Sequence, residues 1–147
     1  MPATNFNLYV GIRLVRAYTD GVVVHCRVRK ELLNFAGVLH GGVTATLADV
    51  AVGQALIRRG HPSTTVELKI NYLRPITGRT VKARSHILRI GKTLCTGRVD
   101  IFDDQNNLAA VALVTYMLLD AADPRALRSA KAAQALKRPR NLSRETA

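Results

Sequence analysis

Cysteine and aromatic residues are scarce in this sequence, which has two Cys, no Trp, four Tyr and three Phe. Cys26 and Cys95 are too few for a disulfide framework. Neither belongs to a Cys-x-x-Cys motif or to a Cys/His cluster that would indicate a zinc site. Residues 1–7 lack the basic and apolar regions of a secretion signal. We therefore expect free thiols and a cytoplasmic protein.

Long hydrophobic runs are also absent. None approaches the roughly 20 apolar residues that are needed to cross a bilayer, and no internal repeat is visible. Because 48% of the 147 residues are hydrophobic, the chain has enough apolar side chains for one globular domain with a sizeable core.

Acidic residues are few, with 10 Asp and Glu against 22 Lys and Arg, which gives a net charge of +12. Residues 121–147 carry +5 of it and residues 1–120 the remaining +7. This charge favours anionic partners such as nucleic acid, a membrane surface or a phosphate-bearing small molecule. Aromatic residues do not alternate with basic ones, and no zinc-finger or recognition-helix pattern is present, so nucleic acid and membrane are not favoured.

Two kinds of hydrophobic pattern organise the chain. Residues 43–57 lack proline and strand alternation and are apolar nearly all round, which predicts a buried helix. Alternation or apolar runs bounded by turn residues predict strands at residues 10–18, 22–30, 66–72, 80–90, 94–102 and 108–119. The expected fold is α+β, a mostly antiparallel sheet wrapped around one long helix. We place this domain at residues 1–120 and a basic helix or tail at 121–147.

Asp49 is the only ionisable residue between Val43 and Ile57. A carboxylate among apolar residues is costly unless it is paired or hydrogen-bonded, and helix propensity does not favour Asp in a helix interior. Such groups are frequent in functional sites. The alternative is a structural ion pair with an Arg from a neighbouring strand or subunit.

His40-Gly41-Gly42 directly precedes the predicted helix. Unpaired amides at a helix N-terminus point toward developing negative charge and suit an oxyanion hole, although Gly-Gly here is equally compatible with a tight turn. Gly41 and Asp49 are eight residues apart, about 12 Å along one helix. If both act on one carbonyl, Asp49 must come from a partner subunit, which predicts an obligatory dimer.

These residues belong to a longer pattern, Asn34-Phe35-Ala36-Gly37-Val38-Leu39-His40-Gly41-Gly42 followed by Leu47-Ala48-Asp49. The pattern resembles the hotdog-fold acyl-CoA thioesterases of the PaaI-like and thioesterase-superfamily-member-2 type. The likeness extends from about residue 5 to residue 119 and does not include the tail.

The resemblance implies a role for each matching residue. Asp49 matches the general base or nucleophile, and Gly41 matches the residue whose backbone N–H polarises the thioester carbonyl. Asn34 and His40 match residues that orient the carbonyl, the carboxylate or the water, and Thr65 matches a Ser or Thr that holds the attacking water. Asn34 is also a common turn residue, His40 suits a purely structural role, and Thr65 suits an ordinary strand position.

The resemblance also implies a CoA site at the surface, where positive charges contact the phosphates. We assign this role to a basic set made of Arg89, Lys92, Arg58 and Arg59. Each of them individually is compatible with a solvated surface charge. His25, His61 and His86 show no metal-ligand spacing with Cys, Asp or Glu, so we expect no metal and no cofactor.

The sequence therefore predicts hydrolysis of an acyl-CoA to a free acid and CoA, by a homodimer or dimer of dimers with a shared active site. The alternative hypothesis is that the chain is a non-catalytic acyl-CoA-binding or sensing hotdog protein. A hotdog enoyl-CoA hydratase ranks third, because it would need Asp and His closer together than His40 and Asp49.

Overall fold

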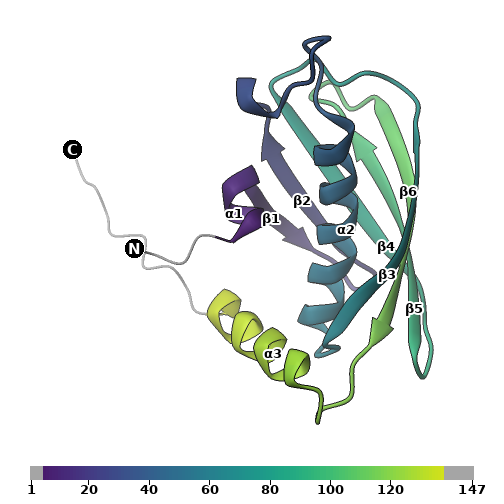
Figure 1. Cartoon of the computed structure of the whole chain (residues 1–147). Coiled ribbons are helices and arrows are strands. Elements are labelled where there is room, and N and C mark those ends of the chain that lie inside the picture. Colours follow the sequence, from purple (N-terminus) through teal and green to yellow (C-terminus); the bar gives the residue numbers. More distant parts are fainter. Residues whose placement is uncertain (1–4, 138–147) are drawn as a thin grey trace.

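The computed structural model describes residues 5–137. In chain order its elements are α1 (Phe6–Val10), β1 (Ile12–Ala17), β2 (Val22–Arg27), the 3-10 turn η1 (Lys30–Leu32), α2 (Gly41–Arg58), β3 (Ser63–Tyr72), β4 (Thr80–Ile90), β5 (Leu94–Phe102), β6 (Leu108–Leu118) and α3 (Pro124–Lys137). The strands form one six-stranded sheet in the order β1-β2-β4-β5-β6-β3, and every neighbouring pair is antiparallel. The helix α2 lies along one face of this curved sheet (Figure 1). The predicted α+β fold is confirmed.

The N-terminal segment differs from the sequence prediction. A single strand was expected at residues 10–18, but Val10 ends the helix α1 and β1 begins at Ile12. The Asn5 side chain caps α1 by accepting from the Leu8 N–H, and Gly11 ends it with a φ of 88°. These two local features interrupt the strand, because a left-handed residue cannot continue it.

The C-terminal segment begins after β6. The helix α3 has Pro124 in its first turn, where the missing N–H of proline removes no intrahelical bond. The division into a domain at residues 1–120 and a tail at 121–147 stays a prediction, and residues 138–147 of that tail lie outside the described residues. No helix between residues 5 and 137 has the length and hydrophobicity of a membrane span.

The sheet covers one side of α2 completely. The fully buried residues on this side are Thr44, Leu47, Ala48, Ala51, Val52, Ala55 and Leu56. They pack against the central strands β4, β5 and β6, whose inward side chains, such as Val81, Ile101 and Val114, are equally buried. The opposite side of α2 was predicted to be buried as well, but there Val50 and Ile57 are only half-buried in the single chain.

Two small residues on the sheet allow α2 to pack close to it. A Cβ on Gly97 of β5 would lie 2.8 Å from a methyl carbon of Val52, so only glycine leaves room for the helix there. The hydroxyl of Ser85 on β4 is fully buried; it donates to the Ala51 carbonyl at 2.9 Å and accepts from the Val22 N–H at 3.0 Å. Ser85 thus links α2 to two strands.

We expect Ser85→Ala to lower the free energy of unfolding by about 1–3 kcal/mol, because the buried Val22 N–H loses its acceptor. Urea denaturation followed by circular dichroism measures this change. Ser129→Ala on α3 serves as the control, since among residues 5–137 its side chain has no hydrogen bond. Equal stabilities of the two variants would show that the Ser85 hydroxyl does not hold the helix to the sheet.

Ionic hydrogen bonds of the Asp20 carboxylate stabilise the turn between β1 and β2. The Asp20 carboxylate accepts from Arg84 at 2.6 Å and lies 3.0 Å from His86 Nδ1, and Arg84 stacks 4.0 Å from the centre of the Tyr18 ring. Hydrogen bonds from Arg84 and then from His86 lower the pKa of Asp20 from 3.8 to about 2. Its side chain is 49% exposed, so solvent screening weakens the contribution to stability.

Because the pKa of Asp20 is lower in the folded state, its stabilising effect is complete well above pH 3.8 and disappears as the pH falls toward 2. Asp20→Asn should therefore melt below wild type at pH 6, and the difference should shrink as the pH is lowered through this range. Thermal melts at stepped pH measure it. Asp120→Asn, which removes an exposed carboxylate with no ion pair among the described residues, should show no such convergence.

Candidate active site

The edge strand β3 lies beside α2 and places side chains along it. Its pairing with β6 contains a bulge at Val66, since Thr65 and Glu67 pair with the consecutive residues Tyr116 and Thr115. A bulge shifts the alternation of side chains by one position. As a result Thr65 before the bulge and Tyr72 after it both face α2, although they are seven residues apart.

Asp49 is held by two hydroxyl groups. The Thr65 hydroxyl donates to Asp49 Oδ1 at 2.8 Å, and the Tyr116 hydroxyl lies 2.8 Å from the same oxygen and 2.7 Å from the Asp49 backbone carbonyl. Among residues 5–137 Asp49 forms no ion pair, so the alternative of a structural pair with an Arg does not hold within one chain. The second carboxylate oxygen, Oδ2, receives no hydrogen bond from the described residues and is free to bind water.

Tyr116 was not predicted from the sequence. It lies in the apolar run of β6, is 6% exposed, and is the cross-strand partner of Thr65. Burial and the nearby Asp49 charge raise the pKa of Tyr116 well above its usual range, so the phenol stays protonated and donates. A Cβ on Gly53 would lie 2.8 Å from the Tyr116 oxygen. The Asp-x-x-x-Gly spacing on α2 was the available signal for a bulky group packed next to Asp49.

A pocket of about 280 Å³ opens at Asp49. Its lining comes from α1, α2, β3 and β6, and the residues are Asn7, Asp49, Val50, Gly53, Gln54, Ile57, Ser63, Thr64, Thr65 and Tyr116. The structure therefore brings together Asp49 and Thr65, two of the predicted site residues, in one accessible hollow.

A second pocket of about 350 Å³ lies at the other end of β3 and contains Asn34 and Gly41. The Asn34 side-chain oxygen accepts from Ala36 N–H at 2.9 Å and from Val38 N–H at 3.3 Å, which orders the loop. The Tyr72 hydroxyl donates to the Gly41 carbonyl at 2.7 Å. Gly41 N–H begins α2 and has no acceptor among the described residues, so it is available for a ligand oxygen.

His40 is the N-cap of α2. Its Nδ1 accepts from the Gly42 N–H at 2.9 Å, and a neutral imidazole in this arrangement carries its proton on Nε2. The ring thus fixes the loop and holds the start of the helix, next to the free Gly41 N–H. This contact agrees with the structural role that the sequence left open for His40.

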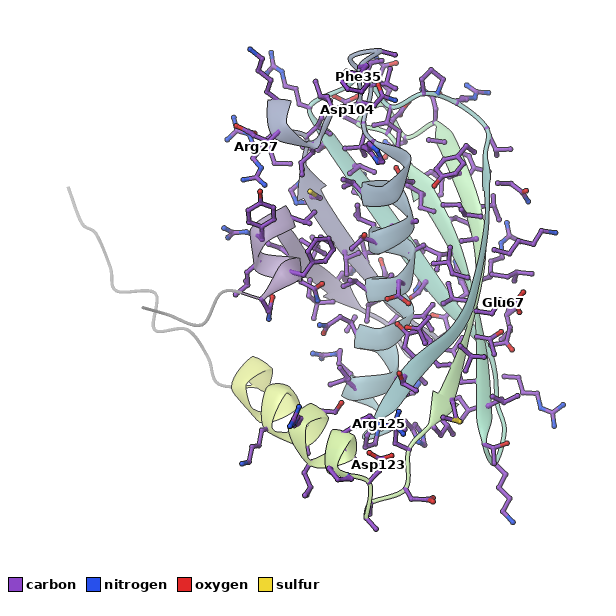
Figure 2. All side chains as sticks on the ribbon, viewed as in Figure 1. Arg27, Phe35, Glu67, Asp104, Asp123 and Arg125 are labelled. Atoms are coloured by element: carbon purple, nitrogen blue, oxygen red, sulfur yellow. The ribbon has the colours of Figure 1, made fainter. Side chains whose placement is uncertain are left out.

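The two pockets lie one above the other along α2 and do not merge in a single chain. Gly41 is in one and Asp49 in the other, about 12 Å apart by the rise of the helix. Phe35, next to Asn34 in the loop before α2, is fully exposed at the top of the molecule (Figure 2). Within one chain, Gly41 and Asp49 therefore line separate pockets.

The predicted phosphate contacts fall in two places. Arg58 and Arg59 at the end of α2 line a third hollow, of about 670 Å³, together with the β1–β2 turn. Arg59 donates to the Ala55 carbonyl at 3.1 Å and to the Thr19 carbonyl. Arg89 and Lys92 are exposed at the β4–β5 hairpin and line none of these three hollows.

Within residues 5–137, no three His, Cys, Asp or Glu side chains gather as metal ligands would.

Comparison with known proteins shows which family this chain belongs to. Residues 36–110, which include the start of α2, Asp49 and most of the sheet, match the family model described as the thioesterase superfamily. Human acyl-coenzyme A thioesterase 13 is 39% identical over 103 residues, which cover 67% of this chain and 74% of that protein. The chain belongs to the thioesterase superfamily. It is an enzyme that hydrolyses thioesters.

Two further relatives of the enzyme agree with this assignment. The medium/long-chain acyl-CoA thioesterase YigI of Escherichia coli is 33% identical over 101 residues, covering 55% of this chain and 63% of that protein. The phenylacetic acid degradation protein PaaI of Thermus thermophilus has a solved structure that superposes with a TM-score of 0.72 at 28% identity, covering 78% of this chain and 98% of that one. The hotdog fold and the predicted PaaI-like resemblance are confirmed.

Tyr116→Phe should keep the packing of the ring but remove one donor to the Asp49 carboxylate. A hydrogen bond to a charged group contributes about 1.5–3 kcal/mol, so we expect kcat to fall by roughly 10- to 100-fold with KM little changed. Thiol release from an acyl-CoA measures kcat and KM.

Tyr9→Phe is the matched control, since the exposed Tyr9 hydroxyl has no hydrogen bond among the described residues and Tyr9 lines none of the three pockets, so the change should leave turnover intact. If Tyr116→Phe and Tyr9→Phe both had the same kcat as wild type, the Tyr116 hydroxyl would have no part in positioning the carboxylate.

Proposed function

We propose that the enzyme hydrolyses an acyl-CoA thioester to a carboxylic acid and CoA, with Asp49 as its catalytic carboxylate. The observation that carries the proposal is the position of this carboxylate, which is held through Oδ1 by two hydroxyls and lines an open pocket. The names of the relatives described above, which include two acyl-CoA thioesterases, support the substrate class. A cytoplasmic location stays a prediction.

The chemistry needs a donor for the carbonyl oxygen and a carboxylate for the attack. The Gly41 N–H binds the thioester oxygen at the positive end of the α2 dipole and stabilises the negative charge that develops there. Asp49 either removes a proton from the attacking water or attacks the carbonyl carbon itself to form a mixed anhydride, which water then hydrolyses. In both routes the C–S bond breaks and the CoA thiolate leaves and takes up a proton. Thr65 keeps the carboxylate, and the water beside it, in place.

Pairing of the β3 strands of two chains would produce an active site that the two chains share. The free edge of β3 is ten residues long, and Val66 and Tyr72 on it are each more than half exposed. Unprotected edges of this length tend to pair with another strand. In antiparallel pairing about a twofold axis near the middle of β3, the Thr65 end of one strand meets the Tyr72 end of the other. The Asp49 pocket of one chain then lies next to the Gly41 pocket of its partner.

Other exposed groups fit this dimer and a CoA site at its surface. Phe35 is a large apolar side chain beside the Gly41 pocket, where a partner subunit would cover it. The basic set Arg58, Arg59, Arg89 and Lys92 lies at the lower end of the molecule in Figure 1, where α2 ends and the β4–β5 hairpin turns. Positive charges at that end suit the phosphates of CoA. A dimer of dimers is compatible with the same contacts.

Asp49→Asn tests the reaction and the residue together. The amide neither accepts a proton nor attacks, yet it is nearly isosteric, so we expect kcat to fall by at least about 10³-fold with an unchanged melting temperature. The assay is thiol release from acyl-CoAs of varied chain length and aromatic character. Near-normal turnover by Asp49→Asn would remove Asp49 from the mechanism. Binding without thiol release by the wild type would instead favour the non-catalytic acyl-CoA sensor.

A further inference from the structure

Two consecutive glycines begin α2 and make its first turn conformationally permissive. A Cβ on Gly41 would lie 3.1 Å from the Tyr72 oxygen and 3.2 Å from the ring carbon that carries this oxygen. The close approach of the Tyr72 ring therefore favours glycine at position 41. A glycine inside a helix costs about 1 kcal/mol relative to alanine, because its backbone loses more conformational freedom on folding. The start of α2 consequently gains from a restraint that comes from outside the helix.

The peptide group between Gly41 and Gly42 is held at both ends. Its carbonyl accepts a hydrogen bond from the Tyr72 hydroxyl at 2.7 Å, and its N–H donates to His40 Nδ1 at 2.9 Å. The His40 contact is local, whereas Tyr72 lies on β3, 31 residues away in the chain. Tyr72 is thus the contact that ties this peptide group to the sheet.

The N–H of Gly41 belongs to the preceding peptide group, whose carbonyl accepts from the Val43 N–H at 2.9 Å. Only the two rotatable backbone bonds of Gly41 separate this group from the one that Tyr72 holds. With both peptide groups held, these two bonds have no freedom to turn. The direction of the free Gly41 N–H is therefore fixed as well.

The Tyr72 bond does more than satisfy a polar atom. The Gly41 carbonyl lies in the first turn of α2, where helix geometry already pairs it with the N–H four residues later, so Tyr72 supplies a second donor to the same oxygen. Tyr72 is 53% exposed and lines the Gly41 pocket, so water is an available partner for its hydroxyl. Desolvation raises the pKa of Tyr72, which keeps the phenol protonated and able to donate.

We propose that Tyr72 is a positioning residue, which keeps the Gly41 N–H directed at the thioester oxygen by fixing the Gly41 carbonyl. Its own hydroxyl does not touch the reacting atoms. An oxyanion donor acts through its preorganised position, and a misplacement of about 1 Å can lower a rate about 100-fold. This inference rests on the proposed function, because it needs Gly41 to bind the thioester oxygen.

Tyr72→Phe tests this role, because it keeps the ring next to Gly41 and removes only the hydroxyl. We expect kcat for an acyl-CoA to fall about 10- to 100-fold and KM to stay within about twofold, since an oxyanion donor contributes most in the transition state. Thiol release measures both constants. Tyr9→Phe serves again as the control and should match wild type.

Two non-hydrolysable ligands distinguish the position of one N–H from the general stability of the pocket. S-hexyl-CoA has no carbonyl, whereas hexanoyl-carba(dethia)-CoA is a ketone in which a methylene replaces the thioester sulfur. In calorimetry, wild type should bind the ketone about five- to tenfold more tightly, which corresponds to one hydrogen bond. Tyr72→Phe should bind S-hexyl-CoA as wild type does and lose most of the preference for the ketone. Tyr116→Phe, which alters the carboxylate instead, should keep this preference.

A ketone preference or a kcat that is the same in Tyr72→Phe and wild type would overturn the role of Tyr72 and leave Asp49 in the mechanism. Loss of S-hexyl-CoA binding by Tyr72→Phe would also overturn it, because the hydroxyl would then support the whole pocket. If wild type neither hydrolyses acyl-CoAs nor prefers the ketone, the proposed function fails, and the role of Tyr72 fails with it.

Discussion

The fixed spacing of residues along α2 determines how an active site that uses both Gly41 and Asp49 can be built. Gly41 begins the helix and Asp49 follows eight residues later, so an unbroken helix keeps the free N–H and the carboxylate about 12 Å apart. No movement of side chains closes that distance, because one group is a backbone amide and an Asp side chain is short. Each chain consequently holds two partial pockets, and a site that uses both groups has to be assembled from two chains.

The edge strand β3 is what makes such an assembly geometrically simple. It runs past both pockets, with Thr65 at the Asp49 end and Tyr72 at the Gly41 end. The bulge at Val66 turns both side chains to the helix side. Two such strands paired antiparallel exchange their ends, and the carboxylate of one chain meets the amide of the other. In the proposed dimer the same strand positions the proposed catalytic groups and provides the surface for association.

Much of this could be predicted from the sequence, because the deciding signals were local. Alternation located the strands, and an isolated carboxylate in an apolar helix identified Asp49. Tyr116 escaped detection because a Tyr in a central strand looks like an ordinary core residue, and only the antiparallel register places it opposite Thr65. The bulge at Val66 depends on tertiary packing, which leaves no pattern in the sequence. The helix α1 was missed because a cap and one left-handed glycine, not periodicity, define it.

Mixing two inactive variants tests the shared site most directly. Asp49→Asn removes the carboxylate, and Gly41→Val crowds the oxyanion pocket, since a Cβ there would lie 3.1 Å from the Tyr72 oxygen. Unfolding the two variants together and refolding them allows one chain to supply Gly41 and the other Asp49. If the site is shared, the mixture should recover about a quarter of the activity of wild type refolded in the same way. A mixture as inactive as each variant alone would contradict a site built from two subunits.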